Sequence, residues 1–376
     1  MKIVYNIAGT WRSGGMERVL ANKVNWLAAN GHDVTVITTD QLGKEPFYPI
    51  DSRVRCIDLG INYEENNGGG LADKLLHFPA KQRRHKRALR RALAEIKPDI
   101  TVSMFNNDAP IVASLKEAGK RVLEVHFSRD KRLQFRRSGL WALIDRFRNW
   151  QDGRTASRFD RFVVLTEEDK PCWGNLSNIC VIPNSSPFKV DTPNALDSKI
   201  VFSAGRLGFQ KGYERLIEAW SIAVKDCPGW QLVIAGEGED KERLQQLIAD
   251  LGVQDSVRLI GATRDIERCY RNASAVALSS RFECLPMILI EAQSFGLPIA
   301  AFACKCGPKD IVTEGVDGFL APEGDIPALA QALHKLMSDD PLRHRLGSAA
   351  FASSHRYDEN VVMSTWENLF TDLLKN

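Results

Sequence analysis

Short apolar runs alternate with longer helical stretches along the whole chain of 376 residues. Apolar runs of a few residues, bounded by polar or glycine-rich segments, are typical of buried strands in a parallel sheet. The stretches between them carry apolar residues at helical spacing, as from Met16 to Leu27. We therefore predict strands at 3–7, 34–38, 100–104, 122–125, 162–165, 180–182, 200–203, 232–235, 257–260, 275–278, 299–302 and 318–321.

This strand and helix order divides the chain into two halves. Segment 183–194 is rich in Pro, Ser and Asn, a composition typical of a linker. Each half has the order of a doubly wound Rossmann-like domain, in which ligands bind beyond the carboxyl ends of the strands. We expect an α/β protein whose two domains, 1–185 and 186–356, face each other across a cleft. The amphipathic residues 357–376 are expected to form a terminal helix that packs back toward the first domain.

Composition narrows the class of protein. Hydrophobic residues make up 44% of the chain, and no apolar stretch approaches the ~20 residues that span a bilayer. The first residues predict a strand that enters a glycine loop and lack the features of a signal peptide, so we expect a cytoplasmic protein. The eight cysteines show neither a zinc pattern nor a disulfide framework, and we expect them to be reduced.

Charge is distributed unevenly between the halves. Residues 1–186 hold 30 Lys and Arg against 21 Asp and Glu, whereas the remainder holds 20 against 26. The first half is therefore basic and the second acidic, which indicates that the halves meet different partners.

Candidate chemistry begins with two glutamates, Glu283 and Glu291, that have seven residues between them. The strand at 275–278 precedes them, and Pro286 suits the first turn of the helix that follows. A carboxylate accepts hydrogen bonds from vicinal hydroxyls, and a helix N-terminus offers free N–H groups to a phosphate. The pair can thus hold a sugar and a ribose, or both acids can simply complement the helix dipole.

Two further segments carry candidate phosphate ligands. Arg206 directly follows a strand and Lys211 precedes the next helix, so both can hold a diphosphate and stabilise it as a leaving group without a metal ion. Gly14 and Gly15 precede a helix, where a phosphate can approach bare N–H groups. The alternatives are solvated loop cations and an ordinary glycine turn. The glycine spacing does not fit the dinucleotide fingerprint, which disfavours an oxidoreductase.

In their order along the chain, these motifs resemble the retaining GT-B glycosyltransferases of family 4. The resemblance extends over essentially the whole chain and includes further segments at 124–126, 163–169, 182–184, 235–238, 306–312 and 315–320. It implies a GT-B fold, a nucleoside diphosphate sugar as donor, with UDP or GDP as the nucleotide, and no cofactor. Members of this family do not generally need a metal, and no Asp-x-Asp triplet is present here.

The resemblance also implies roles for individual residues. Glu291 matches the glutamate that binds the ribose, and Glu283 matches the one that faces the donor sugar. His126 resembles a histidine near the reaction centre, although a lone histidine after a strand is more often structural. The implied catalytic set is Glu283, His126, Arg206 and Lys211, and the implied donor-binding set is Gly14, Gly15, Asn184, Arg206, Lys211, Glu283, Leu285, Pro286, Met287 and Glu291. Cys284 departs from the family pattern, where glycine is common.

Basic segments of the first half suggest where an acceptor is presented. Segment 81–93 holds seven Lys and Arg without an acid, and segment 129–150 mixes Arg and Lys with Phe and Trp. Such segments suit an anionic membrane surface or a polyprenyl-linked glycan, and the resemblance implies an acceptor in this domain. Solvated basic helices are the alternative. Nucleic acid is disfavoured because no recognised binding module accompanies the charge.

The principal hypothesis is a metal-independent retaining hexosyltransferase for surface polysaccharide or lipid-linked glycan assembly, peripheral at the inner face of the plasma membrane. A nucleotide-sugar epimerase of similar architecture is one alternative, since it would consume the donor without an acceptor. A non-catalytic nucleotide-sugar or lipid-glycan binding protein is another. The donor base, the sugar, the acceptor and the linkage depend on pocket shape, which motif spacing does not determine.

Overall fold

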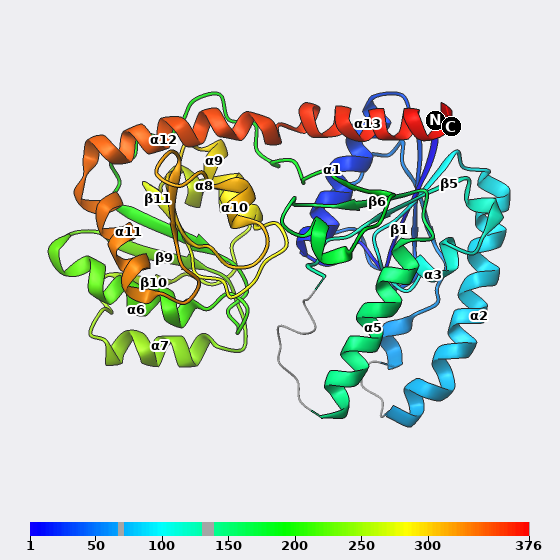
Figure 1. Ribbon diagram of the computed structural model, residues 1–376, viewed down its shortest axis with the longest axis horizontal. Coiled ribbons are helices and arrows are strands. Elements are labelled where there is room, and N and C mark those ends of the chain that lie inside the picture. Colours follow the sequence, from blue (N-terminus) through cyan, green and yellow to red (C-terminus); the bar gives the residue numbers. More distant parts are fainter. Residues whose placement is uncertain (67–70, 130–138, 376) are drawn as a thin grey trace. The chain divides into compact units, whose positions relative to one another are not determined.

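The computed structural model describes residues 1–66, 71–129 and 139–375 (Figure 1). The chain divides into two compact units. Unit 1 consists of Met1–Leu165, Lys170–Ile182 and Met363–Asn376, and unit 2 consists of Thr166–Asp169 and Pro183–Val362. The main passage from one unit to the other therefore falls at the start of the Pro- and Ser-rich segment, and the end of the chain belongs to unit 1.

Unit 1 is built on a seven-stranded sheet with the order β3-β2-β1-β4-β5-β6-β7. Every neighbouring pair is parallel. The order reverses between β1 and β4, which makes their carboxyl ends the topological switch point of this unit. The strands are β1 Lys2–Ile7, β2 Asp33–Thr38, β3 Arg55–Asp58, β4 Ile100–Ser103, β5 Lys120–Glu124, β6 Arg161–Val164 and β7 Ile179–Val181.

The helices of unit 1 are α1 Gly15–Ala29, α2 Leu71–Ile96, α3 Ala109–Val112 and α5 Leu140–Ala156, together with most of α13 Glu359–Lys375. The long helix α2 contains the basic segment 81–93 and has Pro79 within it. Of the second basic segment, residues 130–138 lie outside the described residues, and its later part forms the beginning of α5.

Unit 2 repeats the architecture with a six-stranded parallel sheet in the order β10-β9-β8-β11-β12-β13. Its switch point lies between β8 and β11. The strands are β8 Ile200–Ala204, β9 Gln231–Ala235, β10 Val257–Leu259, β11 Ala275–Leu278, β12 Ile299–Phe302 and β13 Gly318–Ala321. The helices are α6 Tyr213–Ala223, α7 Lys241–Asp250, α8 Ile266–Arg271, α9 Met287–Ser294, α10 Pro308–Ile311, α11 Ile326–Ser338 and α12 Asp340–Ser354.

The predicted α/β class with two doubly wound sheets is confirmed, and each predicted strand coincides with an observed one. The prediction was incomplete at β3, which it did not include. Strand β3 is short, has the sequence RCID, and its residues are largely exposed. It lies at the edge of the sheet beside β2. An edge strand with charged ends has no continuous apolar run, so the criterion used for buried strands cannot detect it.

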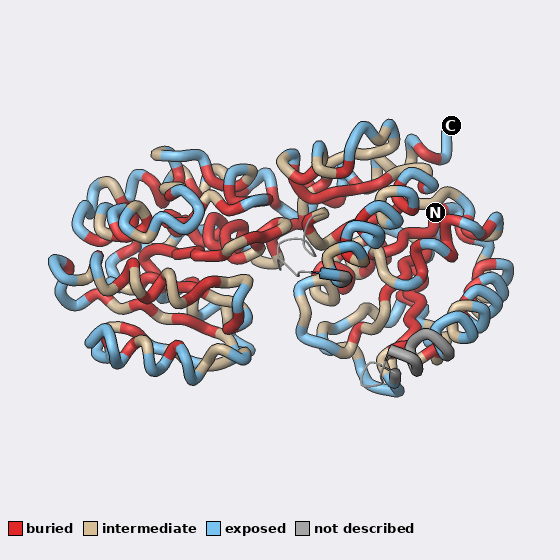
Figure 2. Tube along the Cα trace, turned by 60° about the horizontal axis from the view of Figure 1, so that its bottom comes forward, coloured by how far each residue is buried: buried red, intermediate tan, exposed pale blue. Residues whose placement is uncertain are grey.

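Each unit has its own hydrophobic core, which runs along the strands, while exposed residues follow the outer sides of the helices (Figure 2). In unit 2, Val201 and Leu232 of the sheet pack with Trp220 of α6 and Leu333 of α11. Because helices cover the inner strands, both faces of these strands must be apolar, which explains the continuous apolar runs in the sequence.

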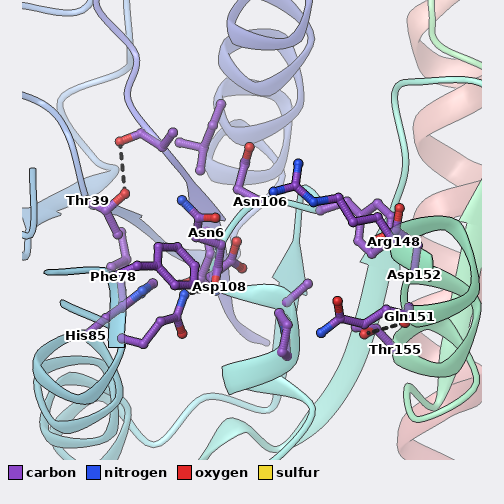
Figure 3. A pocket seen from close by; sticks show the side chains of 18 of the residues that line it. Asn6, Thr39, Phe78, His85, Asn106, Asp108, Arg148, Gln151, Asp152 and Thr155 are labelled. Atoms are coloured by element: carbon purple, nitrogen blue, oxygen red, sulfur yellow. Dashed lines mark hydrogen bonds between the residues drawn. The ribbon is translucent and has the colours of Figure 1, made fainter. Parts of the chain in front are cut away.

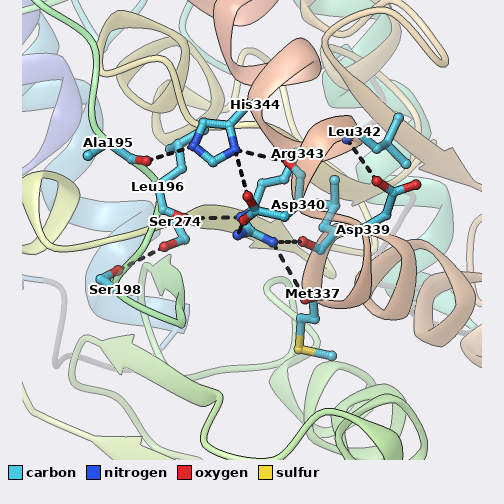
Figure 4. A network of polar contacts seen from close by, with 11 residues as sticks. Ala195, Leu196, Ser198, Ser274, Met337, Asp339, Asp340, Leu342, Arg343 and His344 are labelled. Atoms are coloured by element: carbon cyan, nitrogen blue, oxygen red, sulfur yellow. Dashed lines mark hydrogen bonds and ion pairs between the residues drawn. The ribbon is translucent and has the colours of Figure 1, made fainter.

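A buried arginine fastens the last helices of unit 2 to the segment that enters its first strand (Figure 4). Arg343 of α12 donates from Nε to the Leu196 carbonyl oxygen at 3.0 Å and from Nη1 to the Leu336 carbonyl oxygen at 3.0 Å. Its guanidinium also pairs with Asp340 and lies 5.1 Å from the centre of the Trp230 ring. These contacts compensate the buried charge of Arg343 on several sides.

Candidate active site

The loops that follow β8 and β11 flank the switch point of unit 2 and carry its charged residues. Lys211, in the first loop, places its Nζ 2.6 Å from Oε1 of Glu283 in the second loop. Ser280 donates to the same Glu283 oxygen at 2.6 Å. The Glu283 side chain is 8% exposed and that of Lys211 is 20% exposed. The Glu283 side chain is therefore buried, while the Lys211 side chain keeps some exposure to solvent.

Two glycines allow the first loop to take this path. At Gly205 an added Cβ would lie 2.9 Å from Cε of Lys211, so any other residue would push the lysine away from Glu283. Gly212 has φ +61°, and a Cβ there would lie 2.6 Å from the Ser279 carbonyl oxygen. A left-handed backbone in close contact with another strand's loop requires glycine.

Arg206 does not join Lys211 in this structure. Its guanidinium pairs with Glu239 at 3.0 Å, and the two side chains are 77% and 57% exposed. Exposed pairs of this kind contribute little, so the pairing does not fix the side chain strongly. The two predicted diphosphate ligands come from the same loop but have different partners.

Glu291 lies within α9 and is buried, with 8% exposure. The Tyr270 hydroxyl donates to its Oε2 at 2.5 Å. The Tyr270 ring stacks on Phe295, with ring centroids 5.4 Å apart. Glu291 is thus held by an aromatic residue, Tyr270, whereas Glu283 is held by the cation of Lys211.

The start of α9 gathers the remaining predicted donor-binding residues of unit 2. Pro286 is the residue that caps the helix, so the helix begins at Met287, one residue later than expected. The Asn184 amide nitrogen lies 3.7 Å from the sulfur of Met287. Leu285 is buried and Cys284 is half-buried. A Cβ on Gly307 would lie 2.4 Å from Cδ of Pro286, so that glycine permits close packing behind this turn.

Cys304 is a residue of this site that the sequence analysis did not single out. Burial is the main cause that raises the pKa of its thiol far above its ordinary value, and the charge of Glu283 adds to the effect. The thiol therefore stays protonated at neutral pH and is a poor nucleophile. In the sequence, the only signal for Cys304 is the apolar run of β12, at whose carboxyl end it lies.

In unit 1, Gly14 caps α1 and Gly15 is its first residue. The Glu17 side chain folds back over this turn, where a Cβ on Gly14 would clash with its carboxylate. Burial raises the Glu17 pKa, while its backbone hydrogen bond and the charges of Arg12 and His126 oppose the rise. The helix N-terminus that was predicted to bind phosphate thus also holds an acidic side chain of its own helix.

His126 belongs to a buried charged network that the sequence did not reveal. Its Nε2 lies 3.0 Å from Oε1 of Glu124, and that oxygen also pairs with the ammonium group of Lys23. The Lys23 and Glu124 side chains are 2% and 0% exposed. Burial opposes ionisation of Glu124, but Lys23 and His126 outweigh it and lower the Glu124 pKa to about 2. The ring of Trp366, from α13, lies 3.9 Å from the Lys23 nitrogen.

A cavity of about 650 Å³ lies at the switch point of unit 1. The carboxyl ends of β1 and β4 form its floor, and residues of α2 and α5 form its sides. Buried polar residues that line this cavity, Asn6, His85 and Asp108, were not predicted as site residues (Figure 3). Asn6 and Asp108 follow the general rule that ligands bind beyond the ends of such strands, and this is the signal that could have identified them.

Within the described ranges 1–66, 71–129 and 139–375, no three His, Cys, Asp or Glu side chains gather in a way that could hold a metal ion.

Two doubly wound units, with a lysine–glutamate pair at the switch point of the second, are the architecture expected of a GT-B glycosyltransferase. Two family models match the chain. The model of Glycosyl transferases group 1 matches residues 186–353, and that of the Glycosyl transferase 4-like domain matches residues 14–170. The chain therefore belongs to the group 1 glycosyltransferases, and the family resemblance is confirmed.

Two curated relatives match over almost their full lengths. An uncharacterized glycosyltransferase of Haemophilus influenzae is 28% identical over 98% of this chain and 99% of its own. The amylovoran biosynthesis glycosyltransferase AmsD of Erwinia amylovora is 27% identical over 98% and 99%. These relatives favour a glycosyltransferase of glycan biosynthesis over the epimerase and the non-catalytic binding protein.

Solved structures confirm the GT-B fold. Sucrose-phosphate synthase from Thermosynechococcus elongatus has a TM-score of 0.83 at 18% identity and covers 100% of this chain and 99% of its own. A variant of S. aureus TarM, crystallised with fondaparinux, alpha-GlcNAc-glycerol and UDP, has a TM-score of 0.77 at 17% identity and covers 98% and 99%.

Proposed function

We propose that this glycosyltransferase moves a hexose from a nucleoside diphosphate sugar to a glycan or lipid-linked acceptor in surface polysaccharide biosynthesis. The observation that carries the proposal is the contact of Lys211 with Glu283 at the switch point of unit 2. The ammonium group of a partly exposed lysine suits a diphosphate, and a carboxylate beside it suits the hydroxyls of the sugar attached to that diphosphate.

Several residues then share the work of donor binding. Lys211 and Arg206 hold the diphosphate, and Glu283 holds the donor sugar. Glu291 holds the ribose, with Tyr270 fixing its carboxylate through the 2.5 Å hydrogen bond. The remaining donor-binding residues, Gly14, Gly15, Asn184, Leu285, Pro286 and Met287, supply backbone groups and packing.

Family resemblance motivates the retaining outcome. The bond between the anomeric carbon and the diphosphate oxygen breaks, and the diphosphate leaves with the electron pair. The acceptor oxygen forms its bond on the same face of the sugar and gives its proton to the departing phosphate. Lys211 stabilises the negative charge that develops on the leaving group. His126, oriented by Glu124 at 3.0 Å, contacts sugar hydroxyls at this centre.

A transfer assay with proton NMR of the first product tests these claims. We expect the anomeric configuration of the donor to be kept and activity to persist in a chelator. An inverted product would contradict retention, and loss of activity in EDTA that Mg²⁺ restores would contradict metal independence. Consumption of donor with no acceptor product, in the form of an isomerised nucleotide sugar, would instead identify an epimerase.

The relatives suggest which substrates to test first. One structural neighbour is an Anabaena protein, HepE, crystallised with UDP and glucose. A curated relative from Campylobacter jejuni, 26% identical over 99% of both chains, is named as an N-acetylgalactosaminyltransferase acting on an undecaprenol-linked glycan. We therefore propose UDP-sugars before GDP-sugars as donors, and polyprenyl diphosphate-linked glycans as acceptors.

We also propose that unit 1 rests on the anionic inner surface of the plasma membrane. Within the described part of the chain, no helix has the length and apolar character to cross a bilayer. Helix α2 presents four arginines on one surface, Arg83, Arg84, Arg87 and Arg91. Helix α5 exposes large apolar side chains, Trp141, Leu143, Phe147 and Trp150. Cations together with exposed aromatic residues suit a membrane interface.

Sedimentation with vesicles of phosphatidylglycerol and phosphatidylcholine tests this association. Binding should increase with the anionic lipid and decrease with salt, because the Debye length falls to about 8 Å at physiological ionic strength. Replacing Arg83, Arg84, Arg87 and Arg91 with glutamine should abolish it. No binding, or binding indifferent to salt, would contradict the proposal.

A further inference from the structure

Two loops of unit 2 must be held together for Lys211 to meet Glu283. The first loop, 205–212, follows β8, and the second loop, 279–286, follows β11. Lys211 belongs to the first loop and Glu283 to the second, so their 2.6 Å contact depends on how the loops are fastened. The first loop contains three glycines, and a glycine-rich backbone loses much conformational entropy when it is fixed. Its fixation therefore needs contacts from outside the loop.

Arg281 of the second loop makes several contacts with the first loop. Its backbone nitrogen donates to the Gln210 carbonyl oxygen at 2.8 Å, and its Nη1 donates to the Phe209 carbonyl oxygen at 2.6 Å. The guanidinium carbon also lies 4.2 Å from the centre of the exposed Phe209 ring. A cation over an aromatic face is a favourable contact, which accounts for a phenylalanine at this surface position.

The same guanidinium reaches the helix that follows the first loop. It pairs with Glu214, which lies in the first turn of α6. The Arg281 and Glu214 side chains are 19% and 13% exposed, so solvent screens this pair less than it screens a surface pair. Glu214 is held in turn by Arg243 of α7, whose Nη2 lies 3.5 Å from its Oε2. A planar guanidinium has donors in fixed directions, which suits it to hold two acceptors at once.

Gly212 leaves space for this arrangement at the end of the first loop. A Cβ on Gly212 would lie 3.2 Å from Nη1 of Arg281, so a larger residue would press on the guanidinium. The Ser279 hydroxyl adds a further link, because it donates to the Lys211 carbonyl oxygen at 3.0 Å. The backbone next to Lys211 is therefore fixed by the second loop, and the position of the ammonium group follows from these contacts.

We propose that Arg281 is a positioning residue for transfer, which with Glu214 clamps the first loop to the second and so places the Lys211 ammonium group. This role rests on the proposed transferase function. Arg281 acts through Lys211, because its own guanidinium is occupied by Phe209 and Glu214. A displacement of about 1 Å in a positioned group can cost roughly 100-fold in rate, so loss of the clamp should be visible in kcat.

Initial rates of transfer by the full chain test the clamp. Arg281→Met removes the guanidinium and should lower kcat by about 10- to 100-fold with a smaller change in KM, because the leaving group loses a well-placed charge. Arg281→Lys keeps the charge without the planar fork, and its rate should stay closer to that of Arg281→Met than to the wild type. Arg345→Met is the matched control, since Arg345 of α12 is exposed and donates to the Gly315 carbonyl oxygen, which belongs to neither loop.

A double variant separates positioning from a general structural role. In the Lys211→Ala background, Arg281→Met should lower kcat/KM by less than about threefold further, because no ammonium group remains to be positioned. If the two losses multiply instead, Arg281 does not act through Lys211 and the proposal is overturned.

Glu214→Gln separates positioning from direct binding of phosphate by Arg281. It removes one anchor of the clamp, so kcat should fall as in Arg281→Met, although by a smaller factor. Activity equal to or above that of the wild type would show that a released Arg281 serves the diphosphate directly, which also overturns the proposal.

Amide hydrogen exchange tests the clamp without any reaction. The first loop should exchange faster in Arg281→Met than in the wild type, while β8 should exchange as before. Unchanged exchange in the loop overturns the proposal. If the wild type transfers no sugar, the proposed function fails, and hydrogen exchange still decides whether Arg281 fixes the loop. Should Arg281→Met fail to fold by circular dichroism, Glu214→Gln takes its place in the same measurements.

Discussion

One lysine–glutamate pair in unit 1 and one in unit 2 have different surroundings. The Lys23 and Glu124 side chains of unit 1 are 2% and 0% exposed. The Lys211 and Glu283 side chains of unit 2 are 20% and 8% exposed. The first pair is closed on one side by Trp366 and on another by His126. The second pair keeps some exposure through the Lys211 side chain.

The same two residue types, lysine and glutamate, can serve different purposes because the two pairs differ in their exposure to solvent. In a closed ion pair each partner compensates the buried charge of the other, and neither is reached by a ligand. A partly exposed pair can bind a ligand, because a cation at the surface loses less hydration when a phosphate arrives.

The largest effect is expected from breaking the closed pair. Lys23→Met leaves Glu124 buried without its main counter-charge and should reduce the free energy of unfolding by about 3–5 kcal/mol. Urea denaturation measures the change. The double variant Lys23→Met with Glu124→Gln should recover much of the loss, because no uncompensated charge remains. A loss of under about 1 kcal/mol in the single variant would show that the pair is not as closed as described.

A substitution in the Lys211–Glu283 pair should change the activity strongly and the stability much less. Lys211→Ala should lower kcat/KM for transfer by about 10- to 1000-fold, since it removes a charge that stabilises the leaving diphosphate. Lys241→Ala is the matched control, because Lys241 pairs with Glu237 and the two side chains are 40% and 53% exposed. Equal rates in the Lys211 variant, the control variant and the wild type would remove Lys211 from the site.

Two buried acids of unit 1 should give opposite dependences of stability on pH. Burial raises the Asp108 pKa from 3.8 to about 6, and neighbouring Ser103 and backbone groups only moderate the rise. A raised carboxyl pKa means that stability is lost as pH increases from about 4 to about 6. For Glu124, whose pKa falls from 4.5 to about 2, stability is present above pH 4.5 and lost as pH falls toward 2.

Asp108→Asn should therefore stabilise unit 1 at pH 7.5, by roughly 1–3 kcal/mol, and the gain should vanish below about pH 4. Thermal melting over a pH series measures it. Tyr63 interacts electrostatically with Asp108, and His85, Arg148 and Asp152 line the same cavity. A variant that is less stable than the wild type at pH 7.5 would show that the carboxylate is well compensated.

The smallest effect is expected at the exposed pair of Arg206 and Glu239. Glu239→Ala should change the free energy of unfolding by less than about 0.5 kcal/mol, because exposed ion pairs contribute little. Transfer should be undiminished, since Arg206 becomes free to contact a diphosphate. Chemical denaturation and initial rates check the two expectations, and a clear loss of activity would give Glu239 a role that its exposure does not suggest.

Most of the fold was predictable from the sequence because parallel strands buried on both faces need continuous apolar runs. The edge strand β3 was not predicted because it is largely exposed and its sequence, RCID, contains no continuous apolar run. Motif spacing also indicated the charged loops of unit 2, because residues after a strand and before the next helix must lie at the carboxyl edge of the sheet. Motif spacing gave Lys211 and Arg206 the same predicted role as diphosphate ligands. In the structure, however, Lys211 pairs with Glu283 and Arg206 pairs with Glu239.

By itself, the sequence determined two doubly wound sheets, the order of their strands along the chain and the family to which the motifs point. Only the tertiary structure decided which polar groups are paired. It joined Lys23 to Glu124 across 101 positions of the chain and placed Asn6, His85 and Asp108 around one cavity. Apolar periodicity is a local property of a chain. Pairing and burial of single charges arise from segments that are distant in sequence, and no local pattern encodes them.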